Sequence, residues 1–307
     1  MLIGVDVGGT NLRVGVVDNH RVVWENRYHA DFSHLCKSLP PAEALAAIQQ
    51  SLVQSLAEAL ALYPAVSAVG IGFPGFIDPV TQYVLQSPNL PGLINVDVIS
   101  GLRSLLKLPV IVENDASAAA YGEYAISDEL HDLIYIGLGT GVGGGLILAG
   151  KSYPGSNGFA MEIGHLCVVP SGRLCGCGNR GCMEQYASAS GVVLNYGELA
   201  GNARDAEQVA ALAAAGDVHA LKAYEVAGDA LAQGVAHILK VLDVPDVVIG
   251  GGLSLSWKLL QPAFESRLNQ DLIPVLRGRI RVHLSKAGDQ AGIIGAAMLA
   301  QLAATST

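Results

Sequence analysis

Apolar and polar positions along the chain follow two different periods, and together these periods predict a mixed α/β fold. Residues 2–7 (LIGVDV) and 12–17 (LRVGVV) are short apolar runs joined at GGTN, which is typical of paired strands. Residues 21–29 continue as a third strand. Residues 41–62 instead carry Ala, Leu and Gln at helical spacing. The chain is therefore expected to open as a strand meander followed by a long helix.

Further along the first half, two predicted strands end in segments that can carry function. Residues 66–73 form an apolar run that ends at PG, and residues 74–91 are rich in Pro, Gly and Asn, which predicts an exposed functional loop. Residues 109–113 form a short strand that enters NDASAAAYGEY. In this alanine-rich helix, Asp115 can serve as the N-cap.

The second half of the chain repeats the strand, glycine turn and strand pattern of residues 2–17. Residues 133–148 (LIYIGLGTGVGGGLIL) again read as strand, glycine turn and strand, which suggests a duplicated architecture with one phosphate-gripping turn per domain. We place the boundary near Tyr121. The expected domains are residues 1–120 and a larger α/β domain of residues 121–291, with a C-terminal helix from about residue 292 to 307 completing the first domain.

The rest of the second half predicts alternating helices and strands. A helical stretch with an Ala/Leu stripe, broken near Gly216, suits either a core helix or a dimer-facing helix. The predicted elements are the helical stretch 206–242, a strand ending in the glycine turn 249–254, the helix 257–268, the strand 279–284 and the closing helix 293–303.

Composition and charge narrow the class of protein. A length of 307 residues favours two domains. The composition, with 51% apolar and 15% charged residues, is typical of a folded chain. The net charge of -9 makes nucleic acid an unsuitable partner, and it leaves backbone amides and a metal ion to hold any nucleotide. Because the start MLIGVD lacks a basic segment and no apolar run is long enough for a membrane span, we expect a cytoplasmic protein.

Three glycine turns follow predicted strands, at residues 6–11, 137–145 and 249–254. None matches a P-loop or a full dinucleotide-binding fingerprint, and each alone could be a simple tight hairpin. Together with Asp6, which could hold water ligands of Mg²⁺, they suggest a nucleotide site in which the second turn grips phosphates. This arrangement resembles the sugar kinase, Hsp70 and actin superfamily. The resemblance implies a two-domain actin-like ATPase fold with a cleft between the domains.

Four of the five cysteines lie close together in residues 161–185 (MEIGHLCVVPSGRLCGCGNRGCMEQ). In a reducing cytosol such a cluster favours metal ligation over disulfides. The same segment carries His165, Glu162 and Glu184.

Several motifs together resemble the ROK family of bacterial sugar kinases and sugar-responsive repressors, over essentially the whole chain. They are D-x-GGTN at 6–11, GFPG at 72–75, END at 113–115, GTGVGGG at 139–145, E-x-GH at 162–165 and C-x-C-G-x-x-G-C-x-E at 175–184. Repressors of this family carry a DNA-binding domain before the first strand. Because the first strand here begins at Leu2, we expect the kinase branch.

The resemblance implies roles for individual residues. Asp115 would be the catalytic general base, and the sugar-contacting residues would be Gly75, Asn114, Asp115, Glu162, His165 and Glu184. The residues expected to hold the nucleotide and its Mg²⁺ are Asp6, Gly8, Gly9, Thr10, Asn11, Gly139, Thr140, Gly141, Gly143, Gly251 and Gly252.

The resemblance also implies a zinc site, held by His165, Cys175, Cys177 and Cys182. Three thiolates and one imidazole complete a tetrahedron, and such a closed site is structural. The C-x-C spacing is tighter than usual, so Cys167 is a rival ligand. We interpret Cys167 as a buried thiol outside the site. If one ring nitrogen of His165 binds zinc, its orientation is fixed and its other nitrogen can meet a sugar hydroxyl.

The function implied is that of an ATP-dependent hexokinase, most similar to glucokinases, which converts glucose to glucose 6-phosphate and forms a homodimer. The alternatives are an N-acetylmannosamine kinase, a fructokinase or allokinase, and a catalytically silent sugar-binding regulator. For Asp115 the alternative is a plain helix cap, and for Glu162 and Glu184 it is a solvated surface. The histidines that we assign to the surface or to structure are His20, His29, His34, His131, His219, His237 and His283.

Overall fold

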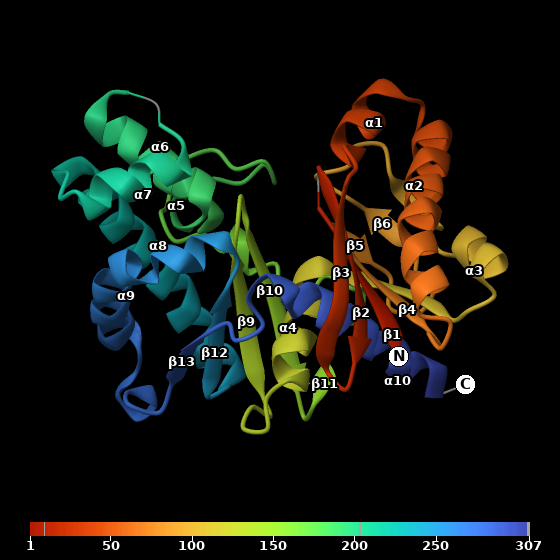
Figure 1. Cartoon of the computed structure of the whole chain (residues 1–307). Coiled ribbons are helices and arrows are strands. Elements are labelled where there is room, and N and C mark those ends of the chain that lie inside the picture. The colour runs from red at the N-terminus through yellow and green to blue at the C-terminus, as the bar shows by residue number, and fades with distance from the viewer. Residues whose placement is uncertain (9, 203, 306–307) are drawn as a thin grey trace. The chain divides into compact units, whose positions relative to one another are not determined.

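Two compact units make up the chain in the computed structural model, which describes residues 1–8, 10–202 and 204–305 (Figure 1). Unit 1 comprises residues 1–131, 145–160 and 286–307, and unit 2 comprises residues 132–144 and 161–285. We expected the boundary near Tyr121, but Tyr121 lies inside a helix of unit 1. The chain first passes into unit 2 at Asp132. Each unit is thus assembled from segments that are distant in the sequence.

Unit 1 contains an α/β core, a small sheet and the C-terminal helix. Its elements are β1 (Leu2–Val7), β2 (Asn11–Asp18), β3 (Arg21–His29), α1 (Phe32–Ser38), α2 (Pro41–Leu62), β4 (Val69–Phe73), β5 (Phe76–Ile77), β6 (Val84–Gln86), β7 (Ile94–Val96), α3 (Ser100–Leu106), β8 (Val110–Asn114), α4 (Asp115–Ala125), β11 (Lys151–Ser152), the 3-10 helix η4 (Gly288–Gln290) and α10 (Ala291–Thr305).

Unit 2 is richer in helix. Its elements are β9 (Leu133–Leu138), β10 (Val142–Leu148, which runs on into unit 1), η1 (Ile163–His165), α5 (Glu184–Ala187), α6 (Ala189–Ala200), α7 (Ala206–Ala214), α8 (Val218–Leu242), β12 (Asp246–Gly250), η2 (Gly252–Ser256), α9 (Trp257–Asp271), η3 (Pro274–Leu276) and β13 (Arg281–Leu284). None of the described helices is long and apolar enough to cross a membrane.

Two five-stranded sheets have the same strand order, β3-β2-β1-β4-β8 and β11-β10-β9-β12-β13. In the first, β1 pairs antiparallel with β2 and parallel with β4, and β4 pairs parallel with β8. In the second, β12 pairs parallel with both β9 and β13. The duplication that the two glycine hairpins suggested is therefore present in the topology, as the actin-like ATPase fold requires.

The first sheet is covered on both faces, and the alternation of residues along β1 decides which helix covers which face. Ile3 and Val5 belong to the same buried cluster as Ile48 of α2. On the opposite face, Gly4 and Gly70 leave room for α10, because a Cβ atom at either position would lie 1.8 Å from a carbonyl oxygen of that helix. These glycines let α10 lie directly on the sheet.

One predicted loop contains structure. Residues 74–91 hold the short strands β5 and β6, which form a three-stranded antiparallel sheet with β7. Ile77 and Val84 are buried as a cross-strand pair in it. The prediction of an exposed loop was wrong here, because strands of two or three residues are too short to show a period of two.

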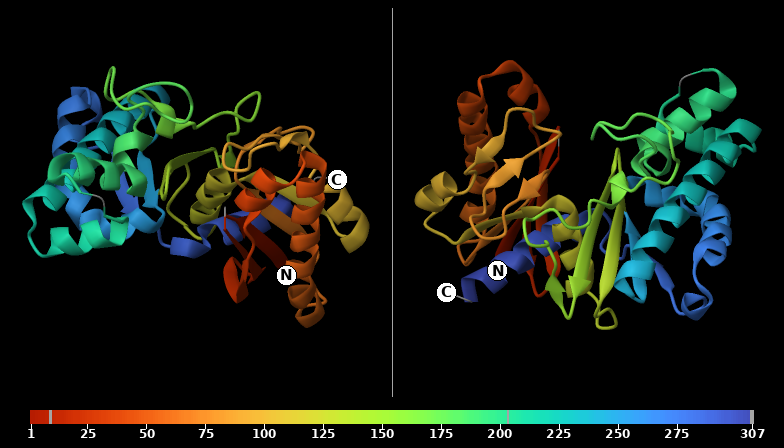
Figure 2. Two further views of the ribbon diagram at one scale, coloured as in Figure 1. Left: turned by 90° about the horizontal axis from the view of Figure 1, so that it is seen from above. Right: turned by 180° about the vertical axis from the view of Figure 1, so that it is seen from behind.

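The long helical stretch of unit 2 is a core element. It divides into α7 and α8 at Gly216, whose φ of +87° favours glycine, and Asp217 then caps α8 by accepting from the backbone N–H of Ala220. The alanine-rich face of α8 is buried, and α8 and α9 pack side by side (Figure 2). The Ala/Leu stripe is therefore explained by packing inside unit 2.

Candidate functional site

The candidate residues of unit 1 gather at the carboxyl ends of three adjacent parallel strands. Asp6 of β1 is paired in register with Gly72 of β4, and Gly72 with Glu113 of β8. Phe73 is likewise paired with Asn114, so the GFPG and END motifs leave the sheet side by side. Ligands of open α/β sheets bind at this edge.

Asp6 has a cationic neighbour that the sequence reasoning missed. The carboxylate oxygen Oδ2 lies 3.9 Å from Nη1 of Arg13, its register partner on β2. Burial raises the pKa of Asp6, and the charge of Arg13 offsets that effect only in part. Arg13 is itself shared with Glu25, at 2.7 Å. The Asp6 side chain remains 30% exposed, so its carboxylate can reach water ligands of Mg²⁺. The hairpin register of GGTN was the signal that could have revealed Arg13.

The first glycine turn closes as a hairpin. The N–H of Gly8 donates to the carbonyl of Asn11 at 2.8 Å, and Thr10 and Asn11 are exposed. Gly9, which we also expected to hold nucleotide, lies outside the described residues. Because they are exposed, Thr10 and Asn11 are accessible to a bound nucleotide.

Asn114, rather than Asp115, caps helix α4. The side-chain oxygen of Asn114 accepts from the N–H of Ser117 at 3.0 Å, and its Nδ2 donates to the carbonyl of Gly75 at 3.1 Å. Asp115 is the first helical residue, and its Oδ1 accepts from the N–H of Ala116 at 2.9 Å. The expectation that Asp115 is the N-cap was therefore wrong: Asn114 has the extended backbone that a cap requires.

Gly75 needs to be glycine at this edge of unit 1. Its φ is +140°, and a Cβ atom there would lie 2.6 Å from the carbonyl oxygen of Gln86. The carbonyl of Gly75 is thereby presented to Asn114. Glu113 is the remaining member of END. Burial raises its pKa, and the hydrogen bond from the N–H of Asn114 offsets this only in part.

Two glycine turns lie together in unit 2. Gly137 of β9 is paired in register with Gly250 of β12, so the turns that follow both strands leave the same edge of the sheet. Gly251 has a φ of +79°, and a Cβ atom there would lie 2.5 Å from the carbonyl oxygen of Leu138. Gly139 and Gly252 face open space instead. Of the other expected residues, Thr140 is exposed and Gly141 and Gly143 are half-buried.

The four expected zinc ligands lie together in unit 2. One ligand atom from each of His165, Cys175, Cys177 and Cys182 lies within 4.8 Å of all the others. Cys175 Sγ is 3.6 Å from His165 Nδ1, and Cys177 Sγ is 3.6 Å from Cys182 Sγ. A Zn–S bond of about 2.3 Å in a tetrahedron places two sulfurs about 3.7 Å apart. The cluster therefore fits zinc in donor chemistry and in spacing.

The pKa values of two of these thiols are shifted in opposite directions. Burial and the neighbouring cysteines raise the pKa of Cys182 to about 12. The pKa of Cys177 is lowered, chiefly because the N–H of Asn179 donates to its sulfur. A divalent cation would supply positive charge to thiolates here, and of the three cysteines Cys175 and Cys182 are buried.

Cys167 is placed differently from our expectation. It is exposed, whereas we predicted a buried thiol, and it is not in the four-residue cluster. An isolated antiparallel bridge pairs Cys167 with Cys182. Cys167 therefore lies next to the cluster along the backbone without belonging to it.

Beside the cluster, unit 2 brings the expected sugar-contacting residues together. His165 directs Nδ1 to Cys175, and its Nε2 lies 3.7 Å from Glu162 Oε2. Burial raises the pKa of Glu162, His165 lowers it, and the nearby Glu184 raises it. The side chains of Glu162 and His165 remain 42% and 32% exposed, so a polar ligand can reach them.

Glu184 touches the second glycine turn. Its Oε2 accepts a hydrogen bond from the backbone N–H of Val142 at 3.0 Å. A Cβ atom at Gly141 would lie 2.4 Å from the same oxygen. Sequence reasoning placed Glu184 with the sugar but gave no sign of this contact, since the two residues lie on separate motifs.

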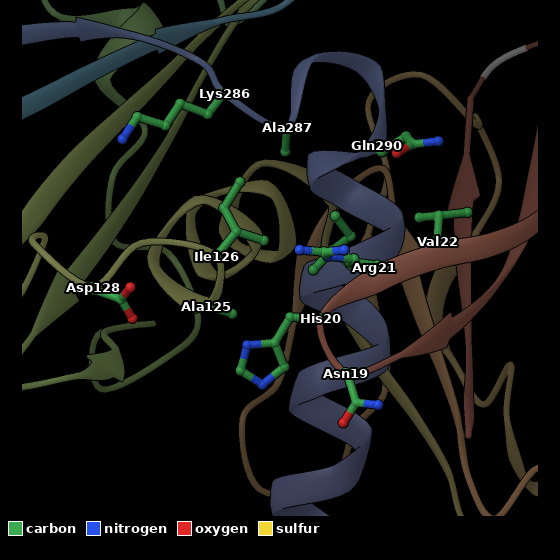
Figure 3. A pocket seen from close by; sticks show the side chains of 11 residues that line it. Asn19, His20, Arg21, Val22, Ala125, Ile126, Asp128, Lys286, Ala287 and Gln290 are labelled. Carbon is green, nitrogen blue, oxygen red and sulfur yellow. The ribbon is translucent and has the colours of Figure 1, made fainter.

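A surface pocket of unit 1 is lined by none of these residues. It has a volume of about 470 Å³, and Figure 3 shows His20, in the turn between β2 and β3, and Arg21, the first residue of β3, beside α10. The lining residues are Asn19, His20, Arg21, Val22, Ala125, Ile126, Asp128, Lys286, Ala287, Gln290 and Ile294. Because none of the expected substrate or metal residues lines it, this pocket is not the candidate site.

Comparison with known proteins bears on the whole chain. Residues 2–303 match the model of the ROK family. The N-acetylmannosamine kinase of Citrobacter koseri is 33% identical over 304 residues, covering 97% of this chain and 98% of that protein. The glucokinase of Thermotoga maritima is 32% identical over 314 residues, covering 97% and 96%. The crystal structure of a ROK family glucokinase from Streptomyces griseus in complex with glucose and AMPPNP is 32% identical, with a TM-score of 0.81 and coverage of 98% and 99%.

Proposed function

This chain belongs to the ROK family, and from that premise we propose that it is an ATP-dependent sugar kinase that phosphorylates the 6-hydroxyl of a hexose. The observation that carries the proposal is the arrangement within unit 2. Glu162, His165 and Glu184 lie together beside the glycine turn at residues 139–142. Hydroxyl-binding groups next to phosphate-binding amides are what a sugar kinase needs.

Unit 1 supplies the groups for the chemical step in this proposal. Asp115 is the general base that accepts the proton of the attacking 6-hydroxyl, and Asn114 contacts the sugar. The Asn114 side chain is oriented by two hydrogen bonds, the capping bond from Ser117 and the bond to the carbonyl of Gly75. The proton leaves the hydroxyl as its oxygen bonds to the γ-phosphorus of ATP, and ADP departs.

Asp6 is the residue of unit 1 that would hold Mg²⁺, through its water ligands. When bound, Mg²⁺ neutralises charge on the phosphate oxygens. The chain has few lysines to do this instead, in keeping with its net charge of -9. The three glycine turns would bind the rest of the nucleotide through backbone amides.

Glucose is the substrate that we propose. Asn114, Asp115, Glu162, His165 and Glu184 offer enough donors and acceptors for every hydroxyl of a pyranose. N-acetylmannosamine is the second candidate, because a relative that is 33% identical bears that name. A fructokinase or allokinase and a catalytically silent regulator are the remaining alternatives. The presence of Asp6, Asp115 and the turn at residues 139–145 supports the enzyme over the regulator.

A coupled assay of ADP release tests the proposal. The purified protein is given ATP, Mg²⁺ and one sugar at a time from a panel of hexoses and N-acetylhexosamines. We expect turnover with at least one sugar and the highest kcat/KM with glucose. Sugar binding without ADP release across the panel would favour the silent regulator. Highest kcat/KM with N-acetylmannosamine would change the substrate and leave the kinase in place.

A further inference from the structure

The helical segment that begins at Glu184 is tied to both sides of the second glycine turn. Glu184 Oε2 accepts from the N–H of Val142 at 3.0 Å, on the outgoing side of the turn. The N–H of Ala189 donates to the carbonyl of Gly139 at 2.9 Å, on the incoming side. Gly139 and Gly141 are themselves joined across the turn by a 3.0 Å hydrogen bond. The turn is therefore held at three points, and one of them is a side chain.

Glycines allow the approach that makes these contacts. At Gly141, a Cβ atom would lie 2.4 Å from Glu184 Oε2, so the carboxylate occupies the space that a side chain would need. At Gly164, in the E-x-GH motif, a Cβ atom would lie 2.3 Å from the carbonyl oxygen of Val142. The turn is thus packed against both segments that carry the proposed sugar-contacting residues.

The cysteine cluster holds the other end of this connection. Glu184 follows Cys182 by two residues, and the N–H of Gln185 donates to the carbonyl of Cys182 at 3.0 Å. Between them, the N–H of Met183 donates to the carbonyl of Leu166 at 2.8 Å. The backbone that presents Glu184 is therefore fixed by residues of the cluster and by the neighbour of His165.

We infer that Glu184 is a positioning residue for the phosphate-binding turn, in addition to its proposed contact with sugar. Its carboxylate accepts a hydrogen bond from the Val142 amide and thereby fixes the conformation of the turn. In this conformation the backbone amides of Thr140 and Gly141 can donate to phosphate oxygens. Through Cys182, the metal cluster orders the nucleotide side of unit 2 as well as the sugar side. Only the identity of the ligand, a nucleotide phosphate, rests on the proposed function.

Two measurements test this inference, and neither requires turnover. The first is amide hydrogen exchange at Val142 in the protein without substrates. The second is the equilibrium dissociation constant for AMPPNP in the absence of sugar. The variants are Glu184→Ala, Glu184→Gln and, as the matched control, Glu162→Ala, which removes a carboxylate from the same region without touching the turn.

In Glu184→Ala we expect Val142 to exchange about tenfold faster or more, and AMPPNP to bind about tenfold more weakly, since a hydrogen bond to a charged group contributes roughly this factor. In Glu184→Gln the carboxamide oxygen can still accept from Val142, so both quantities should return most of the way to the wild-type values. In Glu162→Ala, Val142 exchange and AMPPNP affinity should both stay unchanged, although sugar should bind more weakly.

Unchanged Val142 exchange in Glu184→Ala would overturn the inference, as would wild-type AMPPNP affinity in that variant. Equal losses in Glu184→Ala and Glu162→Ala would also overturn it, because a general loosening of unit 2 would then suffice. If the wild-type protein binds no AMPPNP, the proposed function fails. The exchange comparison still decides whether Glu184 positions the turn, because it needs no ligand.

Discussion

Asn114 accepts a hydrogen bond from the backbone N–H of Ser117 at 3.0 Å, and this bond makes Asn114 the N-cap of α4. The capping role that we first gave to Asp115 belongs to its neighbour. Asp115 begins the helix, at the carboxyl edge of β8. A carboxylate in the first turn of a helix is favourably placed with respect to the helix dipole.

Replacing Asp115 by Asn should lower turnover by about 10²-fold or more, because general-base catalysis contributes on that order. The carboxamide oxygen can still accept from the N–H of Ala116, so folding and sugar binding should be retained. Single-turnover kinetics and sugar binding by calorimetry measure the two effects separately. Near-normal turnover in Asp115→Asn would remove this residue from the mechanism.

The cysteine cluster should hold about one zinc ion per chain, since three thiolates and one imidazole form a closed tetrahedral site. Cys177→Ser should lose zinc and sugar affinity together, because the cluster orients His165. Metal content by mass spectrometry and the KM for sugar check this. Cys167→Ser is the matched control: Cys167 is exposed and lies outside the cluster, so zinc should stay. Zinc-free protein with unchanged kinetics would contradict the assignment.

Unit 2 also contains a buried carboxylate, Asp246, whose charged partners predict how stability depends on pH. Asp246 is 2% exposed and receives hydrogen bonds from Arg281, at 2.6 Å and 2.7 Å, and it lies 2.7 Å from Nε2 of His283. Burial by itself would raise the pKa of Asp246, but these partners more than offset it and the pKa is lowered from its ordinary value of 3.8. His283 is therefore structural, as we expected.

A lowered folded-state pKa means that Asp246 contributes stability above the unfolded-state pKa and that this contribution is lost as pH falls through the folded-state value. Asp246→Asn should lower the free energy of unfolding by about 1–3 kcal/mol at pH 7. The difference from wild type should shrink below about pH 4. Denaturant unfolding at several pH values measures it. Asp229→Asn, whose side chain is 42% exposed in its pair with Arg267, should change stability by less than about 1 kcal/mol. A difference for Asp246→Asn that is constant with pH would refute the linkage.

Substrate preference should follow hydroxyl recognition. A site that hydrogen-bonds a hydroxyl discriminates strongly against analogues that lack it. We therefore expect 2-deoxy and epimeric sugars to show kcat/KM values at least about tenfold below that of glucose. Steady-state kinetics with matched sugars provide the check. A higher kcat/KM for N-acetylmannosamine, fructose or allose would overturn the choice of glucose while leaving the zinc site and the phosphoryl transfer in place.

We also expect a homodimer. The prediction now rests on the family resemblance alone, because the apolar stripe of α8 is buried within unit 2. Light scattering at micromolar concentration should give about twice the chain mass of 31.8 kDa. A single species at the mass of one chain would count against it.

The sequence by itself determined the features that depend on neighbouring residues. Two apolar hairpins with glycine turns predicted the duplicated strand order, and α2 begins and ends where its helical period predicted. The expected metal ligands lie between His165 and Cys182, within one short segment, so the cysteine cluster indicated metal ligation and the family resemblance supplied the ligand set. Sequence patterns of this kind predict local structure correctly because they depend only on backbone geometry and residue type.

Only the tertiary structure decided which distant groups meet. Arg13 reaches Asp6 through strand register, Glu184 meets Val142 through close packing at Gly141, and Asp246 is neutralised from a neighbouring strand. Cys167 is exposed although a backbone bridge pairs it with the buried Cys182. Each of these depends on how two segments are placed in three dimensions to within a hydrogen bond's length, and a one-dimensional pattern of residues carries no such distance.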